Sequence, residues 1–109
     1  MPRLTTHAIP LDVVRRASTP LLDVLVQLTG TARAHFTIEV RTDAFVFDGA
    51  LVPGDPFVEV GLFDRGPEQE DAIARAVTRH FQQALGGVAP DVYLVRLERR
   101  RYFEAGEHF

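Results

Sequence analysis

The chain has 109 residues, of which 46% are hydrophobic and 25% are charged, and its net charge is −3. These values are typical of an ordinary globular protein and predict one domain over residues 1–109. The charge is weakly negative and there is no basic run, so nothing indicates a nucleic-acid partner. No apolar stretch reaches the roughly 18 residues that would span a membrane, and no signal-peptide pattern opens the chain. A cytoplasmic location is therefore expected.

The absence of Cys and Lys limits the chemistry that the chain can perform. The chain has no Cys, which excludes a thiolate nucleophile, a disulfide or a Cys-based metal site, and all twelve of its basic residues are Arg. Arg stays protonated at any working pH and cannot act as an amine base. If Met1 is removed, Pro2 carries a secondary amine with a reference pKa of about 7.7–8.0. It would then be the only amine able to be neutral near pH 7, although a genome rich in Arg codons explains the missing Lys better than selection does.

The first half of the chain reads as strand, helix, strand. Alternation predicts a strand over residues 2–9, and apolar residues at helical spacing predict a helix over 10–28. Pro20 is expected to kink or split this helix, and Gly30 to end it. Residues 35–41, HFTIEVR, are predicted to form the second strand.

The second half repeats this order. Residues 56–63 predict a strand, 67–85 a helix that begins with a proline and is followed by two glycines, and 91–98 the last long strand. Between the halves, residues 44–56 predict a hairpin that turns at an Asp-Gly pair. Residues 99–109 form a polar and aromatic tail.

The repeat predicts an α+β fold in which halves of about 2–41 and 56–98 are βαβ units. Together they would form a four-stranded sheet with both helices on one face, plus the short hairpin. The other face would be left open. We expect it to carry Val58, Val60 and Leu62, and we expect self-association to bury that apolar surface.

Four stretches carry a family resemblance: MP before the first strand, HFTIEV followed by FVFDG, LFDRG before the second helix, and YFEAGEHF at the end. With the repeat and the length, they resemble the tautomerase superfamily, and most closely an uncharacterised group of small bacterial tautomerase-like proteins. The resemblance implies two fused units, a homotrimer, no cofactor, and a small carboxylate-bearing substrate. It also implies that Met removal exposes a catalytic proline.

The resemblance gives Pro2 the role of general base or acid for a proton next to a carbonyl; alternatively it is an incidental second residue. Arg65, between a strand and a helix start, would hold a substrate carboxylate, or would pair on the surface with Asp64 or Glu68. Alternation places Thr37, Glu39 and Arg41 on one face of their strand. Glu39 would activate water or polarise the substrate, or would instead form an ion pair with an Arg at a subunit contact.

Four further residues are assigned to substrate binding. Phe45 and Phe47, in a hairpin that packs near the proline in relatives, would form an apolar wall or simply belong to the core. Tyr102 and His108 in the tail would donate to a substrate oxygen. No metal site is predicted, because His7, His35 and His80 lack ligand spacing and read as structural or solvated.

One departure limits what the resemblance implies. Better-studied short members carry an Arg at the start of the first helix, where this chain has Pro10, Leu11 and Asp12. Arg15, Arg16 and Arg33 are unranked substitutes, and the substrate range of those members is not transferred.

Three functions remain open. The first is a cofactor-independent tautomerase acting on a small 2-oxo acid or its enol. The second is a lyase or dehalogenase on the same scaffold, with Glu39 or a tail residue activating water. The third is a trimeric binding or structural module without catalysis, because a fold alone does not prove an activity.

Overall fold

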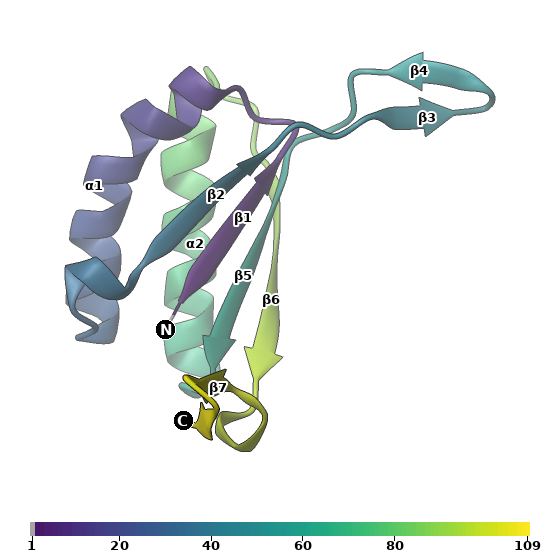
Figure 1. Ribbon diagram of the computed structural model, residues 1–109. Helices are drawn as coiled ribbons and strands as arrows, with labels where there is room; N and C mark the ends of the chain where they lie inside the picture. The colour runs from purple at the N-terminus through teal and green to yellow at the C-terminus, as the bar shows by residue number, and fades with distance from the viewer. Residues whose placement is uncertain (1) are drawn as a thin grey trace.

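The computed structural model describes residues 2–109, which form two βαβ units side by side (Figure 1). The first unit consists of β1 (Arg3–His7), α1 (Leu11–Thr29), a 3₁₀ turn (Arg33–His35) and β2 (Thr37–Arg41). A hairpin of β3 (Phe45–Phe47) and β4 (Ala50–Val52) follows. The second unit consists of β5 (Phe57–Phe63), α2 (Pro67–Ala84) and β6 (Asp91–Leu97). The chain ends with a 3₁₀ turn (Arg99–Arg101) and a hairpin of β7 (Phe103–Glu104) and β8 (Glu107–His108).

The main sheet has the strand order β2-β1-β5-β6. Each unit pairs its own strands in parallel, and β1 and β5 join the two units in antiparallel register. Both helices cover the same face of the sheet (Figure 1). The predicted α+β fold is confirmed. No helix in residues 2–109 is both long enough and apolar enough to cross a membrane.

The helix ends follow from their sequences. Gly30 adopts the left-handed conformation, at φ 67°, and its amide donates to Val26 O at 2.9 Å, which closes α1. Pro67 occupies the first turn of α2, where an amide hydrogen has no partner within the helix. Of the two outcomes predicted for Pro20, the split is wrong, since α1 is one element of 19 residues that contains Pro20, and the kink stays a prediction. Buried Ala17 and Leu21 on either side of Pro20 anchor this helix in the core.

The core lies between the helices and the sheet. Leu4, Val60 and Phe81 are among its fully enclosed members, and residues of both helices and of β1 and β5 meet there. Val58, Val60 and Leu62 belong to this core and are at most 2% exposed. The prediction that these three line the open face is therefore wrong. The helices cover the more apolar side of β5, because burying that side removes more apolar surface from water. Phe57, Glu59 and Gly61 therefore lie on the open side of the strand.

The C-terminal segment covers one end of the open face, where β5 ends. Tyr102 packs edge-on against Phe63 at 5.4 Å, and Phe109 stacks on the same ring at 5.2 Å between ring centroids. The Arg99 guanidinium lies 4.9 Å from the centre of the Phe63 ring. The tail is thus part of the fold, and its β7 segment lies at the end of the sheet where β5 and β6 end (Figure 1).

Candidate functional site

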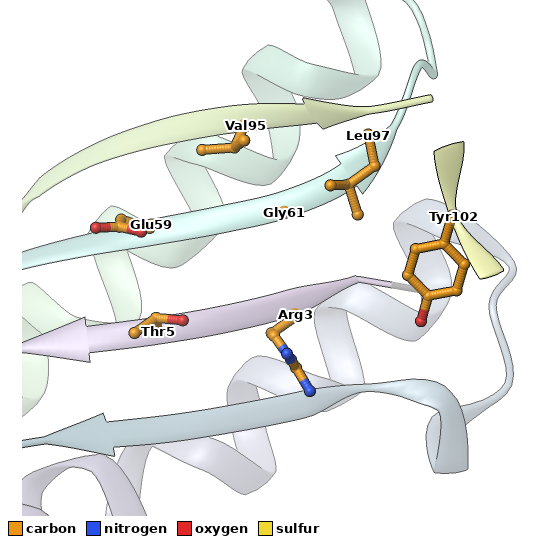
Figure 2. A pocket seen from close by; sticks show the side chains of 7 residues that line it. All are labelled: Arg3, Thr5, Glu59, Gly61, Val95, Leu97 and Tyr102. Atoms are coloured by element: carbon orange, nitrogen blue, oxygen red, sulfur yellow. The ribbon is translucent and has the colours of Figure 1, made fainter. Parts of the chain in front are cut away.

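A cavity of about 280 Å³ lies on the open face of the sheet, beside this C-terminal segment. Figure 2 shows the seven residues that line it: Arg3, Thr5, Glu59, Gly61, Val95, Leu97 and Tyr102. They come from β1, β5 and β6 and from the segment before β7. Gly61 has no side chain where its neighbours along the strand have large ones, which leaves the floor of the cavity open.

Arg3 brings a positive charge to this cavity. Arg3 is exposed, and its side chain makes no hydrogen bond or ion pair with any other residue that the structure describes. In Figure 2 its side chain lies on the same face of the sheet as the other lining residues and extends from β1 toward β2, away from Gly61 and Glu59 on β5. An unpaired guanidinium in a cavity is suited to bind a carboxylate through two parallel hydrogen bonds.

Pro2 directly precedes Arg3. It is buried, and its carbonyl oxygen accepts a hydrogen bond from the Thr37 amide at 3.3 Å, which continues the pairing of β1 with β2. Pro2 is adjacent to the cavity in sequence but does not itself line it. The prediction that Met1 is removed concerns a residue outside the described ones.

Arg65 lies away from the cavity. Its guanidinium donates to Thr29 O at 3.1 Å, to Thr31 Oγ1 at 2.9 Å and to Gln69 Oε1 at 3.3 Å. Gln69 in turn donates to Leu28 O at 2.7 Å. Arg65 thus ties the start of α2 to the end of α1, where the helix dipole favours a positive charge. It pairs with neither Asp64 nor Glu68.

Glu39 lies on the open face, as alternation predicts. One carboxylate oxygen accepts from the Thr5 hydroxyl at 3.4 Å, and the other is 3.5 Å from Arg41 Nε. Thr5 lines the cavity but Glu39 does not. Within the described chain, the ion pair that Glu39 forms is therefore with Arg41 of its own strand.

The four predicted substrate-binding residues lie at two ends of the molecule. Tyr102 lines the cavity, and His108 packs nearby against Phe103 with ring centroids 6.1 Å apart. Phe45 and Phe47 are in the β3–β4 hairpin, which projects from the opposite end of the sheet (Figure 1). Within one chain, the structure does not bring that hairpin together with Pro2.

The Arg residues considered as substitutes lie on α1 or just after it. Arg16 is 3.8 Å from Asp12, and Arg33 forms a 2.6 Å ion pair with Asp23. Arg15 is exposed on the same helix. Because α1 covers the face of the sheet opposite the cavity, none of the three lines it.

Sequence reasoning missed Glu59, the carboxylate of the cavity. Its Oε1 accepts a 2.8 Å hydrogen bond from the Tyr93 hydroxyl. The pKa of Tyr93 is raised above its usual 10.0, chiefly because its hydroxyl donates a hydrogen bond to Glu59. Partial burial and the negative charge of that carboxylate raise it further.

Behind Glu59 lies His7, which is only 8% exposed. Its Nδ1 contacts Asp43 Oδ2, and its Nε2 lies 3.3 Å from Glu59 Oε1. The approach to Glu59 does not have hydrogen-bond geometry, so the buried Nε2 has no bonded partner. The ring stacks on Phe57 at 4.2 Å. His7 is thus a buried residue, which agrees with the structural alternative predicted for it. It also lies between two carboxylates, those of Asp43 and Glu59. No group of three or more metal-binding side chains occurs in the described part of the chain.

The chain is similar in sequence and fold to proteins of unknown function. The model of a domain of unknown function, DUF1904, matches residues 1–108. A protein of unknown function from Vibrio cholerae superposes with a TM-score of 0.88 at 32% identity, covering 99% of this chain and 87% of the other. A DUF1904 domain from Sebaldella termitidis gives a TM-score of 0.89 at 29% identity, with both chains covered in full at 100%. No curated protein sequence matches.

The fold also matches the tautomerase superfamily. A fused 4-OT, solved as an asymmetric trimer, superposes with a TM-score of 0.79 at 15% identity, covering 97% of this chain and 94% of the other. At that identity the likeness extends to the fold alone. The sequence resemblance is therefore confirmed as a structural one.

Proposed function

The chain belongs to the DUF1904 family, and on the fold it shares with the tautomerase superfamily we propose that it is a cofactor-independent tautomerase. Its substrate would be a small 2-oxo acid or the corresponding enol. Pro2 would move the proton, as general base in one direction and general acid in the other.

The observation that carries this proposal is the unpaired Arg3 in a cavity directly after Pro2. A carboxylate held by Arg3 would place the adjacent carbonyl group near the start of β1. Burial of Pro2 and the positive charge of Arg3 would both favour the neutral amine, which is the form that accepts a proton. Tyr102, at the same end of the cavity, would approach a substrate oxygen.

Arg3 takes the role that the sequence assigned to Arg65. Arg65 donates to Thr29 and Thr31 at the end of α1 and to Gln69 in the first turn of α2, and it does not line the cavity. The same reasoning removes Glu39 from direct contact with a substrate in this cavity. It does not change the role proposed for Pro2.

The kinetic test compares Arg3→Ala with Arg75→Ala, an exposed Arg on the far face of α2. Loss of a charge-assisted hydrogen bond costs about 1.5–3 kcal/mol, or roughly 10- to 100-fold in binding. Arg3→Ala should raise KM for the enol of phenylpyruvate by that factor, and Arg75→Ala should leave it unchanged. An unchanged KM in both variants would contradict the role of Arg3.

The role of Pro2 also requires that Met1 be removed, because only then is the Pro2 nitrogen an amine. The intact mass of the purified, untagged protein should be lower than the full sequence by one Met. A dominant full-length mass would exclude Pro2 as a base and favour the non-catalytic binding module.

We also propose a homotrimer, on the evidence of the β3–β4 hairpin. It projects from the body of the molecule (Figure 1), and it carries Phe47 at 74% exposed and Leu51 at 79% exposed. Val46 is exposed beside them. An extended apolar hairpin of this kind is expected to pack on another subunit. The fused 4-OT that shares this fold was solved as a trimer, which supports a three-fold assembly.

A further inference from the structure

We propose that Glu59 is a second proton-transfer residue of this site, acting together with Pro2. This inference rests on the proposed tautomerase function. The inference goes beyond that function because it names the residue that takes the proton from the substrate oxygen.

The first argument is the position of Glu59 relative to Arg3. Thr5 lies opposite Glu59, and Arg3 lies opposite Gly61, across the antiparallel pair of β1 and β5. Arg3 and Glu59 are therefore diagonal neighbours on one face, a relationship that places side chains about 7–8 Å apart at their base. Both line the same cavity, and the side-chain-free Gly61, two positions after Glu59 on β5, lies opposite Arg3 (Figure 2). The Arg3 side chain is exposed, so it can turn toward β5, where a small molecule that it holds would reach Glu59.

The second argument is that the protein holds only one of the two Glu59 oxygens. Oε1 accepts from Tyr93 and faces His7 Nε2, at 2.8 Å and 3.3 Å. Oε2 makes no hydrogen bond or ion pair with any other residue that the structure describes. One oxygen thus fixes the carboxylate while the other remains available to a substrate.

The third argument is the support behind the carboxylate. His7 contacts Asp43 through Nδ1, and its ring is held against Phe57 with an angle of 3° between the planes. Phe57 stacks in turn on Tyr93, at 6.2 Å. The two side chains that reach Glu59 are therefore packed against a shared ring, which fixes the orientation of Glu59. His7 and Tyr93 are positioning residues, since neither need touch the substrate.

The proposed step balances without any co-reactant. In ketonisation, the enol hydroxyl gives its proton to the Glu59 carboxylate, and the electron pair of that O–H bond forms the carbonyl double bond. The electron pair of the carbon–carbon double bond takes a proton from the protonated Pro2 amine, forming a C–H bond. Glu59 is left protonated and Pro2 neutral. Proton exchange with solvent restores both groups.

The test is Glu59→Gln, which keeps the size of the side chain and an oxygen for the Tyr93 hydroxyl. A positioned acid or base contributes typically about 10²–10⁴-fold, so kcat for the phenylpyruvate enol should fall within that range. KM should change little, because Arg3 still holds the carboxylate. The matched control is Glu68→Gln, an exposed carboxylate in the first turn of α2, which should retain the parent rate.

A double-mutant cycle separates positioning from general stability. Tyr93→Phe removes one hydrogen bond to Glu59 and should lower kcat by about tenfold. In the Glu59→Gln background the same change should cost no further rate, since the two act through one carboxylate. Full additivity of the two losses would contradict the positioning role of Tyr93.

Pro2→Ala measured alongside distinguishes the two proposals. If Pro2→Ala loses rate and Glu59→Gln does not, the Glu59 proposal is overturned and the tautomerase function stands. If Glu59→Gln loses rate and Pro2→Ala does not, Glu59 is supported and the proline role fails. If neither variant loses rate, both proposals are overturned.

Discussion

Arg3 and Gly61 lie directly opposite each other on β1 and β5, and the missing side chain at Gly61 opens the space that Arg3 borders. A methyl group at Gly61 would meet only the Arg3 carbonyl oxygen and Leu97 Cδ1, each at 3.8 Å. Those are ordinary contact distances, so the fold tolerates a side chain here. The glycine therefore serves the cavity rather than the backbone.

Gly61→Ala tests that role. The change should leave stability equal or raise it by about 0.4–1 kcal/mol, as for Gly→Ala where the backbone is compatible. It should nevertheless raise KM for the phenylpyruvate enol, because the added methyl occupies part of the cavity. Thermal melting of the sample checks the predicted stability, and steady-state kinetics on the same sample check the predicted rise in KM. A normal KM with unchanged stability would show that the cavity floor does not contact the substrate.

Arg65→Ala should affect stability and not catalysis. It removes two hydrogen bonds to Thr29 and Thr31 at the end of α1 and one to Gln69 in α2, and it leaves their acceptors without a charged partner, at a cost of about 1–3 kcal/mol. The midpoint of thermal unfolding should fall while KM stays at the parent value. A raised KM with unchanged melting would restore Arg65 as the carboxylate-binding residue.

The hydroxyl of Tyr93 offers a spectroscopic measure of its contact with Glu59. Its pKa is raised because the phenol donates to Glu59, and burial and the carboxylate charge oppose the phenolate further. Folding thus favours the protonated phenol. That contribution to stability is complete below the unfolded value near pH 10 and is lost as the pH rises through the folded pKa.

The chain has only two tyrosines and no Trp, so a Tyr102→Phe background leaves Tyr93 as the one phenol. Absorbance of the phenolate as a function of pH should then show a lower titration midpoint in the protein with Glu59→Gln than in the protein that keeps Glu59. The neutral amide still accepts the hydrogen bond, so the shift should shrink rather than vanish. Identical midpoints would mean that Glu59 does not set the acidity of Tyr93.

The projecting hairpin is expected to hold the assembly together. Light scattering after gel filtration should give about three times 12.2 kDa for the parent protein. Phe47→Asp should shift the mass toward the monomer, because it places a charge in the apolar contact. Val88→Asp is the control, since Val88 is exposed at 55% but lies between α2 and β6. A monomeric parent protein would contradict the assembly.

The sequence was sufficient for the two βαβ units and the β3–β4 hairpin, but not for the β7–β8 hairpin of the tail. The two strand-helix-strand patterns, the glycine that closes α1 and the proline that begins α2 all depend on local residue preferences. The alternation in β2 correctly placed Glu39 with Arg41 and opposite Ile38, because a strand has only two sides. Which side the helices cover is a tertiary property, and there the prediction for Val58, Val60 and Leu62 failed.

The contacts at the site depend on register, which local patterns do not contain. His7, Asp43, Glu59 and Tyr93 come from four separate segments, and the pairings of β1 with β2, of β1 with β5 and of β5 with β6 bring them together. Because His7 lacks the spacing of a metal ligand, nothing in the sequence marked it as part of a site. Arg3 was missed for a related reason, because a lone Arg on a strand is recognisable as a site residue only once its lack of partners is seen.

The rate of enol ketonisation, measured for the Met1-processed parent protein and for Pro2→Ala, tests the central proposal most directly. The parent should ketonise the phenylpyruvate enol, and Pro2→Ala should be slower by about 10²–10⁴-fold, with some residual rate from the primary amine of Ala. Equal rates for the two proteins across the range of about pH 5 to 9, over which an amine of this kind titrates, would contradict a catalytic Pro2.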